Sequence, residues 1–214
     1  MTAKSALDMH VAILDFGAGN VGSLGNMLAR KCDCSSSVES AGSAGLAKAT
    51  HWILPGVGHF GYAAEQIRSR GWDALIHSFV RDGGKLLGIC LGAQLLMDFS
   101  EEGEAQGLGL IPGKVKRFQH ADLSKGERIP HMGWSDVEVL HEPLREMMKP
   151  ASRFYFVHAY HMNPLNQEDV LMKAGFAGGF TSAVRHGNVT GVQFHPEKSH
   201  HFGIEFLKAW LSGV

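Results

Sequence analysis

Cys90 lies in a segment whose residues suit nucleophilic chemistry. An apolar run ends in Gly-Ile-Cys-Leu-Gly over residues 88–92. A strand that ends in such a turn presents its middle residue above the sheet, and the flanking glycines avoid collisions that a Cβ would cause. Where a helix follows at once, its free backbone N–H groups and its dipole favour the thiolate over the thiol. The segment therefore predicts a cysteine nucleophile at a turn between a strand and a helix.

A general base and a group that orients it stand together later in the chain. Residues 189–194 alternate as a strand does, and the next residues are His195, Pro196 and Glu197. Side chains two residues apart can point to the same side. Glu197 can then accept the proton on one imidazole nitrogen of His195 and leave the other nitrogen facing Cys90. These residues predict a catalytic triad of Cys90, His195 and Glu197.

A glycine-rich turn at residues 55–58 supplies an oxyanion hole. It reads Pro-Gly-Val-Gly and follows the apolar run at residues 52–54. Such a turn can aim the backbone N–H of Val57 at a developing oxyanion, with the N–H of Leu91 as the second donor. Gly56 and Gly58, on either side of Val57, permit its peptide more than one orientation, so the turn can also act as a gate.

These three segments resemble the catalytic segments of the class I (triad) glutamine amidotransferases. More narrowly, residues 15–20, 130–134 and 155–160 resemble the glutaminase subunits of imidazole glycerol phosphate synthase. They read Asp-Phe-Gly-Ala-Gly-Asn, Pro-His-Met-Gly-Trp and Tyr-Phe-Val-His-Ala-Tyr. All these segments stand in the family's order, and the resemblance extends from about His10 to the C-terminus.

The resemblance implies a reaction, a substrate and a partner. The chain would hydrolyse L-glutamine to glutamate and ammonia without a cofactor. The ammonia would pass to a β/α-barrel cyclase subunit, which forms imidazole glycerol phosphate and AICAR in histidine biosynthesis, so that the two chains form a hetero-oligomer. The isolated chain is expected to be a poor glutaminase that the partner, with its acceptor bound, switches on.

The resemblance also implies two sets of site residues. Groups that bind glutamine are expected at Gly56, Gly58, Gln94, Glu102, Ala159 and Tyr160. The family more often has serine or threonine in place of Ala159. Alanine is tolerated there if backbone groups bind the substrate, and affinity should be weaker if a hydroxyl group does. Contacts with the partner are expected on the active-site face at Asn20, Met132, Trp134, Tyr155 and Lys198. Burial of Trp134 under a neighbouring strand is the alternative.

Composition narrows the class of protein. The 214 residues are enough for one substantial core, expected as a single domain over 10–214 after a tail over 1–9. The net charge of -1 gives no reason to expect nucleic acid or a membrane as partner. No apolar stretch suits a signal peptide or a membrane span, and three cysteines do not suggest a disulfide framework. We therefore expect a cytoplasmic location. The histidines lack the spacing of a metal site, so no metal is expected.

The order of expected elements indicates an α/β fold. Strands at 11–14, 52–54 and 86–89 alternate with helices near 24–30, 62–70 and 72–82, and a helix follows Cys90. This βαβ rhythm predicts a parallel sheet with helices on both faces. The later strands, at 114–118, 135–139, 153–157, 170–174, 181–185 and 189–194, have few helices between them and predict antiparallel additions to the same sheet. A final helix is expected over 199–211, and residues 35–37 and 103–113 are expected to be loops. By the resemblance, the fold is a flavodoxin-like three-layer sandwich.

Other classes of protein are also compatible with the sequence. Residues 17–22 read Gly-Ala-Gly-Asn-Val-Gly, and Glu39 lies near the offset of a ribose-binding acid, which is typical of a dinucleotide-binding module. A cysteine peptidase or an inactive binding subunit on the same fold is also compatible. Within the resembling family, a paralogous branch supplies ammonia to a sugar amidotransferase for surface polysaccharides, and the catalytic residues do not separate the two branches.

Overall fold

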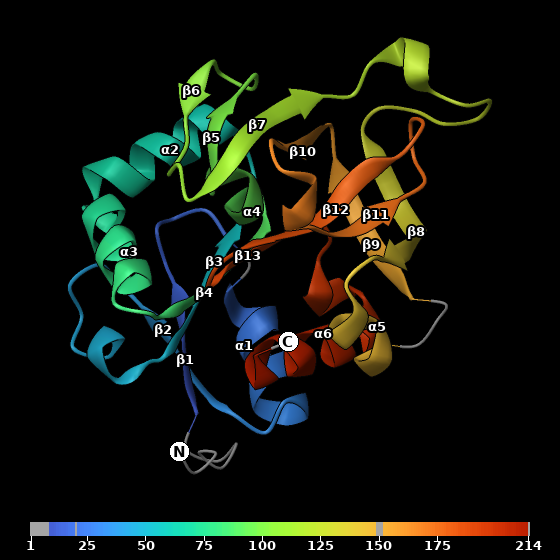
Figure 1. Cartoon of the computed structure of the whole chain (residues 1–214). Helices are drawn as coiled ribbons and strands as arrows, with labels where there is room; N and C mark the ends of the chain where they lie inside the picture. The colour runs from blue at the N-terminus through green and yellow to red at the C-terminus, as the bar shows by residue number, and fades with distance from the viewer. Residues whose placement is uncertain (1–8, 20, 149–151, 214) are drawn as a thin grey trace.

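The computed structural model describes residues 9–19, 21–148 and 152–213. Asn20 and most of the predicted tail therefore lie outside the described residues. A sheet of 13 strands runs through the molecule, with the order β2-β1-β3-β4-β13-β12-β10-β7-β5-β6 along its main path (Figure 1). On this path, β1 to β4 and β13 form a parallel part, as the βαβ rhythm predicts.

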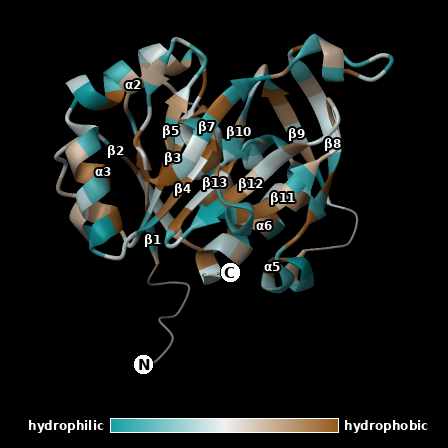
Figure 2. Ribbon diagram, turned by 45° about the horizontal axis from the view of Figure 1, so that its top comes forward, coloured by the Kyte–Doolittle hydropathy of each residue, from teal (hydrophilic) through white to brown (hydrophobic). Residues whose placement is uncertain are grey.

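Apart from the edge strand β2, the parallel part is buried on both faces. Its strands are β1 (His10–Leu14), β2 (Ser35–Glu39), β3 (His51–Gly56), β4 (Lys85–Cys90) and β13 (Val189–Val192). In β1, Val11 and Ile13 belong to one hydrophobic cluster, while Ala12 and Leu14 belong to the other. Because successive side chains of a strand point to opposite faces, the sheet centre must be covered twice. Figure 2 shows this centre as the most hydrophobic part of the sheet.

Helices cover the two faces. The helices α1 (Val21–Lys31) and α6 (His200–Ser212) pack on one face, with Leu28 and Phe206 in the first cluster. The helices α2 (Phe60–Ser69), α3 (Trp72–Arg81) and α4 (Leu91–Leu95) pack on the other face. A short helix, α5 (Glu142–Met147), lies beside α6. The result is a three-layer α/β arrangement.

The second half of the chain extends the sheet with mostly antiparallel pairs, as predicted. The strands are β5 (Met97–Ser100), β6 (Ala105–Gln106), β7 (Ile111–Arg117), β8 (His131–Val139), β9 (Arg153–His158), β10 (Tyr160–Pro164), β11 (Val170–Ala174) and β12 (Phe180–His186). Only β5 and β7 pair in parallel within this half. Strand β8 joins β11 on one side and β9 on the other.

Some predicted elements were wrong. Residues 35–37 were expected to be a loop but form the edge strand β2, where Ser35 and Ser37 hydrogen-bond the two ring nitrogens of His10 across the pair. Residues 103–113 were also expected to be a loop, but they contain β6 and the start of β7. The last predicted strand ends at Val192 rather than Phe194. A run of serines gives no apolar periodicity, so its strand comes from pairing with β1.

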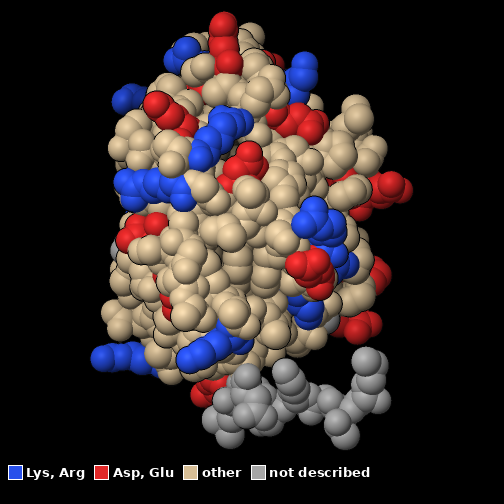
Figure 3. Space-filling model, turned by 90° about the vertical axis from the view of Figure 1, so that its left-hand side faces the viewer, with Lys and Arg blue, Asp and Glu red and all other residues tan. Residues whose placement is uncertain are grey.

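Charged side chains of both signs are spread over one face of the molecule. On the face seen in Figure 3, basic and acidic side chains lie interspersed rather than in fields of one sign. Within the described ranges, no helix is long and apolar enough to cross a membrane.

Candidate active site

Cys90 occupies a strained turn at the end of β4. Its φ and ψ are 54° and -109°, and α4 starts at the next residue. Non-glycine residues rarely adopt such a positive φ, so the surrounding structure must hold Cys90 in place. The sequence predicted a helix after Cys90, and the structure has one, but α4 is only five residues long and the chain continues into β5. Thiolate stabilisation by a helix dipole is therefore weaker than expected, and the local groups around the sulfur matter more.

The two glycines beside Cys90 are required by close packing. A Cβ on Gly88 would lie 2.7 Å from the backbone N and Cα of Ala93. A Cβ on Gly92 would collide with the carbonyl oxygen of Leu54 in β3. The tight turn places α4 directly against the neighbouring strand, as the glycine-bracketed sequence predicts.

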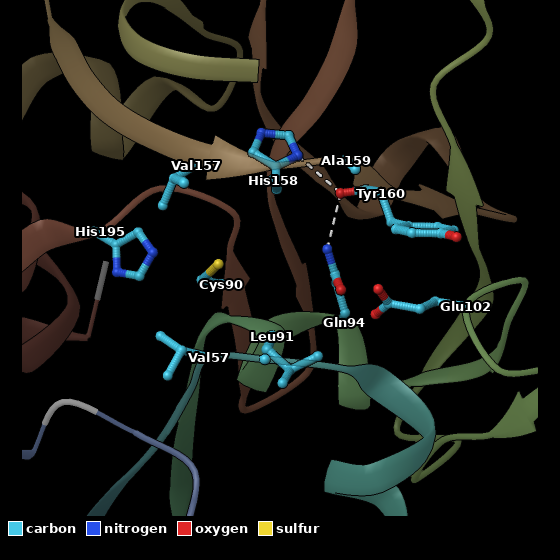
Figure 4. Close-up of a pocket in the computed structure, with 11 residues that line it drawn as sticks. Val57, Cys90, Leu91, Gln94, Glu102, Val157, His158, Ala159, Tyr160 and His195 are labelled. Carbon is cyan, nitrogen blue, oxygen red and sulfur yellow. Dashed lines mark hydrogen bonds between the residues drawn. The ribbon is translucent and has the colours of Figure 1, made fainter. Parts of the chain in front are cut away.

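His195 and Glu197 lie behind the sulfur on the segment that follows β13. Nδ1 of His195 is 2.9 Å from Oε1 of Glu197, and both side chains are almost completely buried. Because a carboxylate only accepts, this contact fixes the proton on Nδ1 when the ring is neutral. Nε2 of His195 has no hydrogen-bond partner among the described residues and faces the cavity that holds Cys90 (Figure 4).

The electrostatics of this cluster favour a charged imidazole. Burial opposes protonation of His195, but Cys90 and Glu197 outweigh it and raise the pKa of His195 to about 9. A protonated imidazole between a carboxylate and a sulfur stabilises the thiolate form of that sulfur. The arrangement is the one that a thiolate–imidazolium pair requires.

Val57 and Leu91, the two predicted oxyanion donors, directly follow the ends of adjacent strands. In the parallel pair of β3 and β4, Gly56 stands opposite Cys90. Val57 follows Gly56 and Leu91 follows Cys90, so both residues stand at the same end of the two strands. Both line the cavity. Gly58 has a φ of +107°, a conformation that favours glycine. This register brings the two predicted oxyanion donors to the same end of the sheet as the sulfur.

A cavity of about 240 Å³ opens in front of Cys90 (Figure 4). Most of the residues predicted from the sequence to bind glutamine or to act on it contribute to its wall. The lining residues are Val57, Gly58, Cys90, Leu91, Gln94, Glu102, Val157, His158, Ala159, Tyr160 and His195. They come from segments that are far apart in the chain, and the carboxyl ends of parallel strands are where α/β sheets generally bind ligands.

Gln94 and Glu102 are held by contacts of their own. Nε2 of Gln94 donates to the carbonyl oxygen of Tyr160 at 2.9 Å. Oε2 of Glu102 accepts from the backbone N–H of Phe60, at the start of α2, at 2.8 Å. Both side chains therefore reach the cavity from fixed positions rather than from free rotamers.

Some predicted site residues lie outside the cavity wall. Gly56 is buried behind it, where a Cβ would lie 2.7 Å from the backbone N of Gly92. Glu197 lies behind His195, as an orienting group must. The predicted partner residues form an exposed patch beside the site: Met132 is 65% and Trp134 37% exposed. Both belong to strand β8.

The patch is held together by ring contacts. Trp134 stacks on the ring of His200 at 5.4 Å and meets Tyr155 edge-on at 6.2 Å. The ammonium group of Lys198 lies 5.7 Å from the centre of the Tyr155 ring. Asn20, the remaining predicted partner residue, lies outside the described residues. The four described residues thus lie together, and Trp134 is not a core residue.

Sequence reasoning missed three residues of the site. Val157 and His158 line the cavity, and Nε2 of Gln193 lies 3.8 Å from the sulfur of Cys90. Gln193 could have been found from the alternation of side chains along a strand. It stands two residues before His195, so its side chain points to the same side. His158 belongs to a segment, 155–160, that the sequence had singled out for its resemblance alone.

His158 and His161 do not face opposite sides, as a single strand would require. The chain bends at Ala159 between β9 and β10, so both rings contact Phe118. Burial lowers the pKa of His158 to about 3, despite the hydrogen bond from its Nδ1 to the carbonyl oxygen of Tyr160. In the part of the chain that the structure describes, no group of His, Cys, Asp and Glu side chains is placed to hold a metal ion.

The glycine-rich loop after β1 does not have a free ribose-binding acid. Both carboxylate oxygens of Glu39 accept hydrogen bonds from the hydroxyl groups of Ser37 and Ser43. Gly17 lies against the guanidinium group of Arg70, where a Cβ would be 2.9 Å from Nη2. These contacts give the loop a packing role in this fold.

Comparison with known sequences agrees with the site geometry. The family model for class I glutamine amidotransferases matches residues 12–211. A relative from Methanococcus maripaludis, imidazole glycerol phosphate synthase subunit HisH 2, is 41% identical over 203 residues, which cover 94% of this chain and 98% of the relative. The HisH 2 subunit of Pseudomonas aeruginosa is 39% identical over 209 residues, covering 95% of this chain and all of the relative.

Comparison with solved structures agrees on the fold. A crystal structure described as a glutamine amidotransferase superposes with a TM-score of 0.73 at 23% identity, covering 95% of this chain and 99% of that chain. Together with the family match, this confirms the amidotransferase fold predicted from the sequence motifs. The chain belongs to the class I glutamine amidotransferases, among the HisH-like glutaminase subunits of imidazole glycerol phosphate synthase.

Proposed function

We propose that this chain, as one domain over residues 10–214, hydrolyses glutamine at Cys90 and supplies the ammonia to a cyclase subunit of imidazole glycerol phosphate synthase. The observation that carries the proposal is the convergence of the Cys90 sulfur, the buried His195–Glu197 pair, and residues Val57 and Leu91 around one cavity. A nucleophile, an oriented base and oxyanion donors are the parts that acyl transfer needs.

The chemistry follows from these positions. The Cys90 thiolate attacks the carboxamide carbon, and the N–H groups of Val57 and Leu91 stabilise the oxyanion. His195 gives its proton to the leaving nitrogen as the C–N bond breaks, which releases ammonia and leaves a thioester. His195 then takes a proton from water, whose oxygen attacks the thioester, and the C–S bond breaks to give glutamate. Glu197 keeps His195 in the required tautomer throughout.

Groups in the cavity wall bind the charged ammonium and carboxylate groups of glutamine. Both hydrogens of Gln94 Nε2 are used, toward the carbonyl oxygen of Tyr160 and Oε1 of Gln193, so its own Oε1 is the atom that can accept from the substrate ammonium group. The Glu102 carboxylate lies close to Gln94 in Figure 4 and adds a negative charge for the same group. Gly58 and the bend at Ala159 and Tyr160 offer backbone groups to the substrate carboxylate. Ala159 has no hydroxyl, so recognition there must be by the backbone.

The partner docks on the exposed patch of Met132, Trp134, Tyr155 and Lys198. Met132 stands opposite the cavity residue Val157 in the β8–β9 pair, and exposed Met and Trp side chains of this kind are frequent anchors of interfaces. Val57, which is 45% exposed, lines the cavity itself. Docking here would close the cavity toward the partner, so that ammonia leaves toward the acceptor. By analogy with the relatives named HisH, the partner is a cyclase of the HisF type with a β/α-barrel fold.

The described cysteines, Cys32, Cys34 and Cys90, are all free thiols. Reducing compartments keep cysteine thiols free, so we assign the reaction to the cytoplasm.

Reconstitution tests the proposed function. The chain is mixed with a HisF-type cyclase and the cyclase's own substrate, and glutamine-dependent formation of imidazole glycerol phosphate is measured. Formation that requires this chain supports the proposal. If glutamate forms only when a sugar amidotransferase of polysaccharide synthesis is added instead, the chain is a glutaminase of the paralogous branch. No glutamate with either partner would contradict glutaminase activity.

A further inference from the structure

Gln193 is completely buried, and its side chain ends at the nucleophile. It follows the last residue of β13, and its backbone N–H donates to the carbonyl oxygen of Ser182 at 2.9 Å. The side chain lies on the same side of the segment as His195, while Phe194 between them stacks on Phe154 at 3.8 Å. A buried amide must find its partners inside the protein. The partners of Gln193 are Gln94 and Cys90.

One backbone carbonyl fixes the orientation of both amides. The oxygen of Tyr160 can only accept, so the atom of Gln94 that lies 2.9 Å from it must be Nε2. The second hydrogen of this Nε2 points to the Gln193 side chain at 3.1 Å, and the atom that receives it must be Oε1. The remaining end of the Gln193 amide is then Nε2, which lies 3.8 Å from the sulfur of Cys90. The donor faces the sulfur because the chain of hydrogen bonds permits no other assignment.

An N–H group aimed at a sulfur atom discriminates between its two protonation states. Hydrogen bonds to a charged acceptor are about twice as strong as neutral ones, so the donor stabilises the thiolate more than the thiol. The short helix α4 contributes little of this stabilisation, since it has only five residues. His195 approaches the sulfur as a second group that favours its charged form.

We propose that Gln193 stabilises the Cys90 thiolate and holds its sulfur toward the cavity, through a relay that runs from the Tyr160 carbonyl oxygen through Gln94 to Gln193. Its catalytic consequence rests on the proposed glutaminase function, but its effect on the sulfur does not. Because Gln94 also faces the substrate pocket, the same relay ties the substrate-binding wall to the nucleophile.

Alkylation of Cys90 tests the proposal without glutamine. Rates of modification by iodoacetamide are measured against pH, with the Cys90 peptide followed by mass spectrometry. Gln193→Met keeps the size of the side chain and removes the donor, so the alkylation profile should move to higher pH by about one unit, a tenfold loss of thiolate below the thiol pKa. Gln193→Glu should move it further, because a carboxylate repels the thiolate.

Ser182→Ala is the matched control. Ser182 is fully buried beside Gln193, and its hydroxyl oxygen has no partner among the described residues. Its alkylation profile should coincide with that of the unchanged protein. A Gln193→Met protein that melts cooperatively and gives the unchanged profile would overturn the proposal.

The unchanged protein gives a second measurement that does not depend on folding of a variant. The side-chain amide resonances of Gln193 in a ¹⁵N spectrum should titrate together with Cys90 and should stop doing so in Cys90→Ala. Resonances that do not respond to Cys90 would also overturn the proposal. If the alkylation shift occurs but the unchanged protein forms no glutamate with any partner, the thiolate role stands and the proposed function fails.

Discussion

Oε1 of Glu197 lies 2.9 Å from Nδ1 of His195, and this contact decides which nitrogen of the imidazole can act on Cys90. The two residues are separated only by Pro196, and both side chains are buried at the carboxyl end of β13. With Nδ1 held by the carboxylate, Nε2 is the nitrogen available for proton transfer.

This geometry gives His195 and Glu197 unequal roles in catalysis. His195→Ala removes the group that moves protons, so glutamine hydrolysis by the complex should fall on the order of 100-fold or more. Glu197→Gln keeps a hydrogen-bond partner for the ring but loses the charge, so its loss should be smaller. Steady-state glutamate production measures both. An His195→Ala complex with unchanged glutaminase activity would remove the base from the mechanism.

Trp134 should act as an anchor for the partner. Trp134→Ala is expected to weaken the complex by about 30-fold, the effect of a 2 kcal/mol interface anchor. Val38, which is 48% exposed on edge strand β2, provides the control, and Val38→Ala should bind normally. Isothermal titration with the cyclase measures both. Equal affinity of the Trp134→Ala chain, with unchanged thermal stability, would exclude this patch from the interface.

The turn at Val57 should make activity depend on the partner. If the Val57 peptide points its N–H at the oxyanion only in the complex with bound acceptor, the gain of this donor is about 3 kcal/mol, or roughly a hundredfold in turnover. Glutamate production is measured for the chain alone, with the cyclase, and with cyclase plus acceptor. Full turnover by the chain alone, unchanged by either addition, would exclude the gate.

A buried histidine far from the site should control stability in acid. Burial, with a smaller effect of Lys85, lowers the pKa of His51 from 6.5 to about 4. As pH falls below 6.5, the unfolded state binds a proton that the native state does not, so stability is lost until about pH 4. The full effect of this shift is on the order of 3 kcal/mol.

His51→Phe removes this proton-linked loss and can keep the edge contact with Trp210. Urea denaturation at pH 7 and pH 4 should therefore show a smaller loss of unfolding free energy for the variant than for the unchanged chain. Identical losses would mean that His51 is not buried in its neutral form.

The sequence predicted the catalytic residues better than the secondary structure around them. The glycine bracket at Cys90 and the spacing of His195 and Glu197 are local patterns, and the structure places these residues together. Strand β2 and the bend at Ala159 could not be predicted in the same way, because Ser35 and Ser37 become a strand only through pairing with β1. The role of Gln193 could not be predicted for a similar reason, because it depends on contacts with residues about 100 positions away.

Covalent labelling shows directly whether Cys90 is the nucleophile. The complex is treated with a glutamine analogue that carries a diazoketone in place of the carboxamide, and the modified peptides are identified by mass spectrometry. If Cys90 is the nucleophile, one adduct should form, on Cys90, and excess glutamine should prevent it. Burial raises the pKa of Cys32 to about 12 and also raises that of Cys34, so neither should react. An adduct on Cys32 or Cys34, with Cys90 unmodified, would contradict the account.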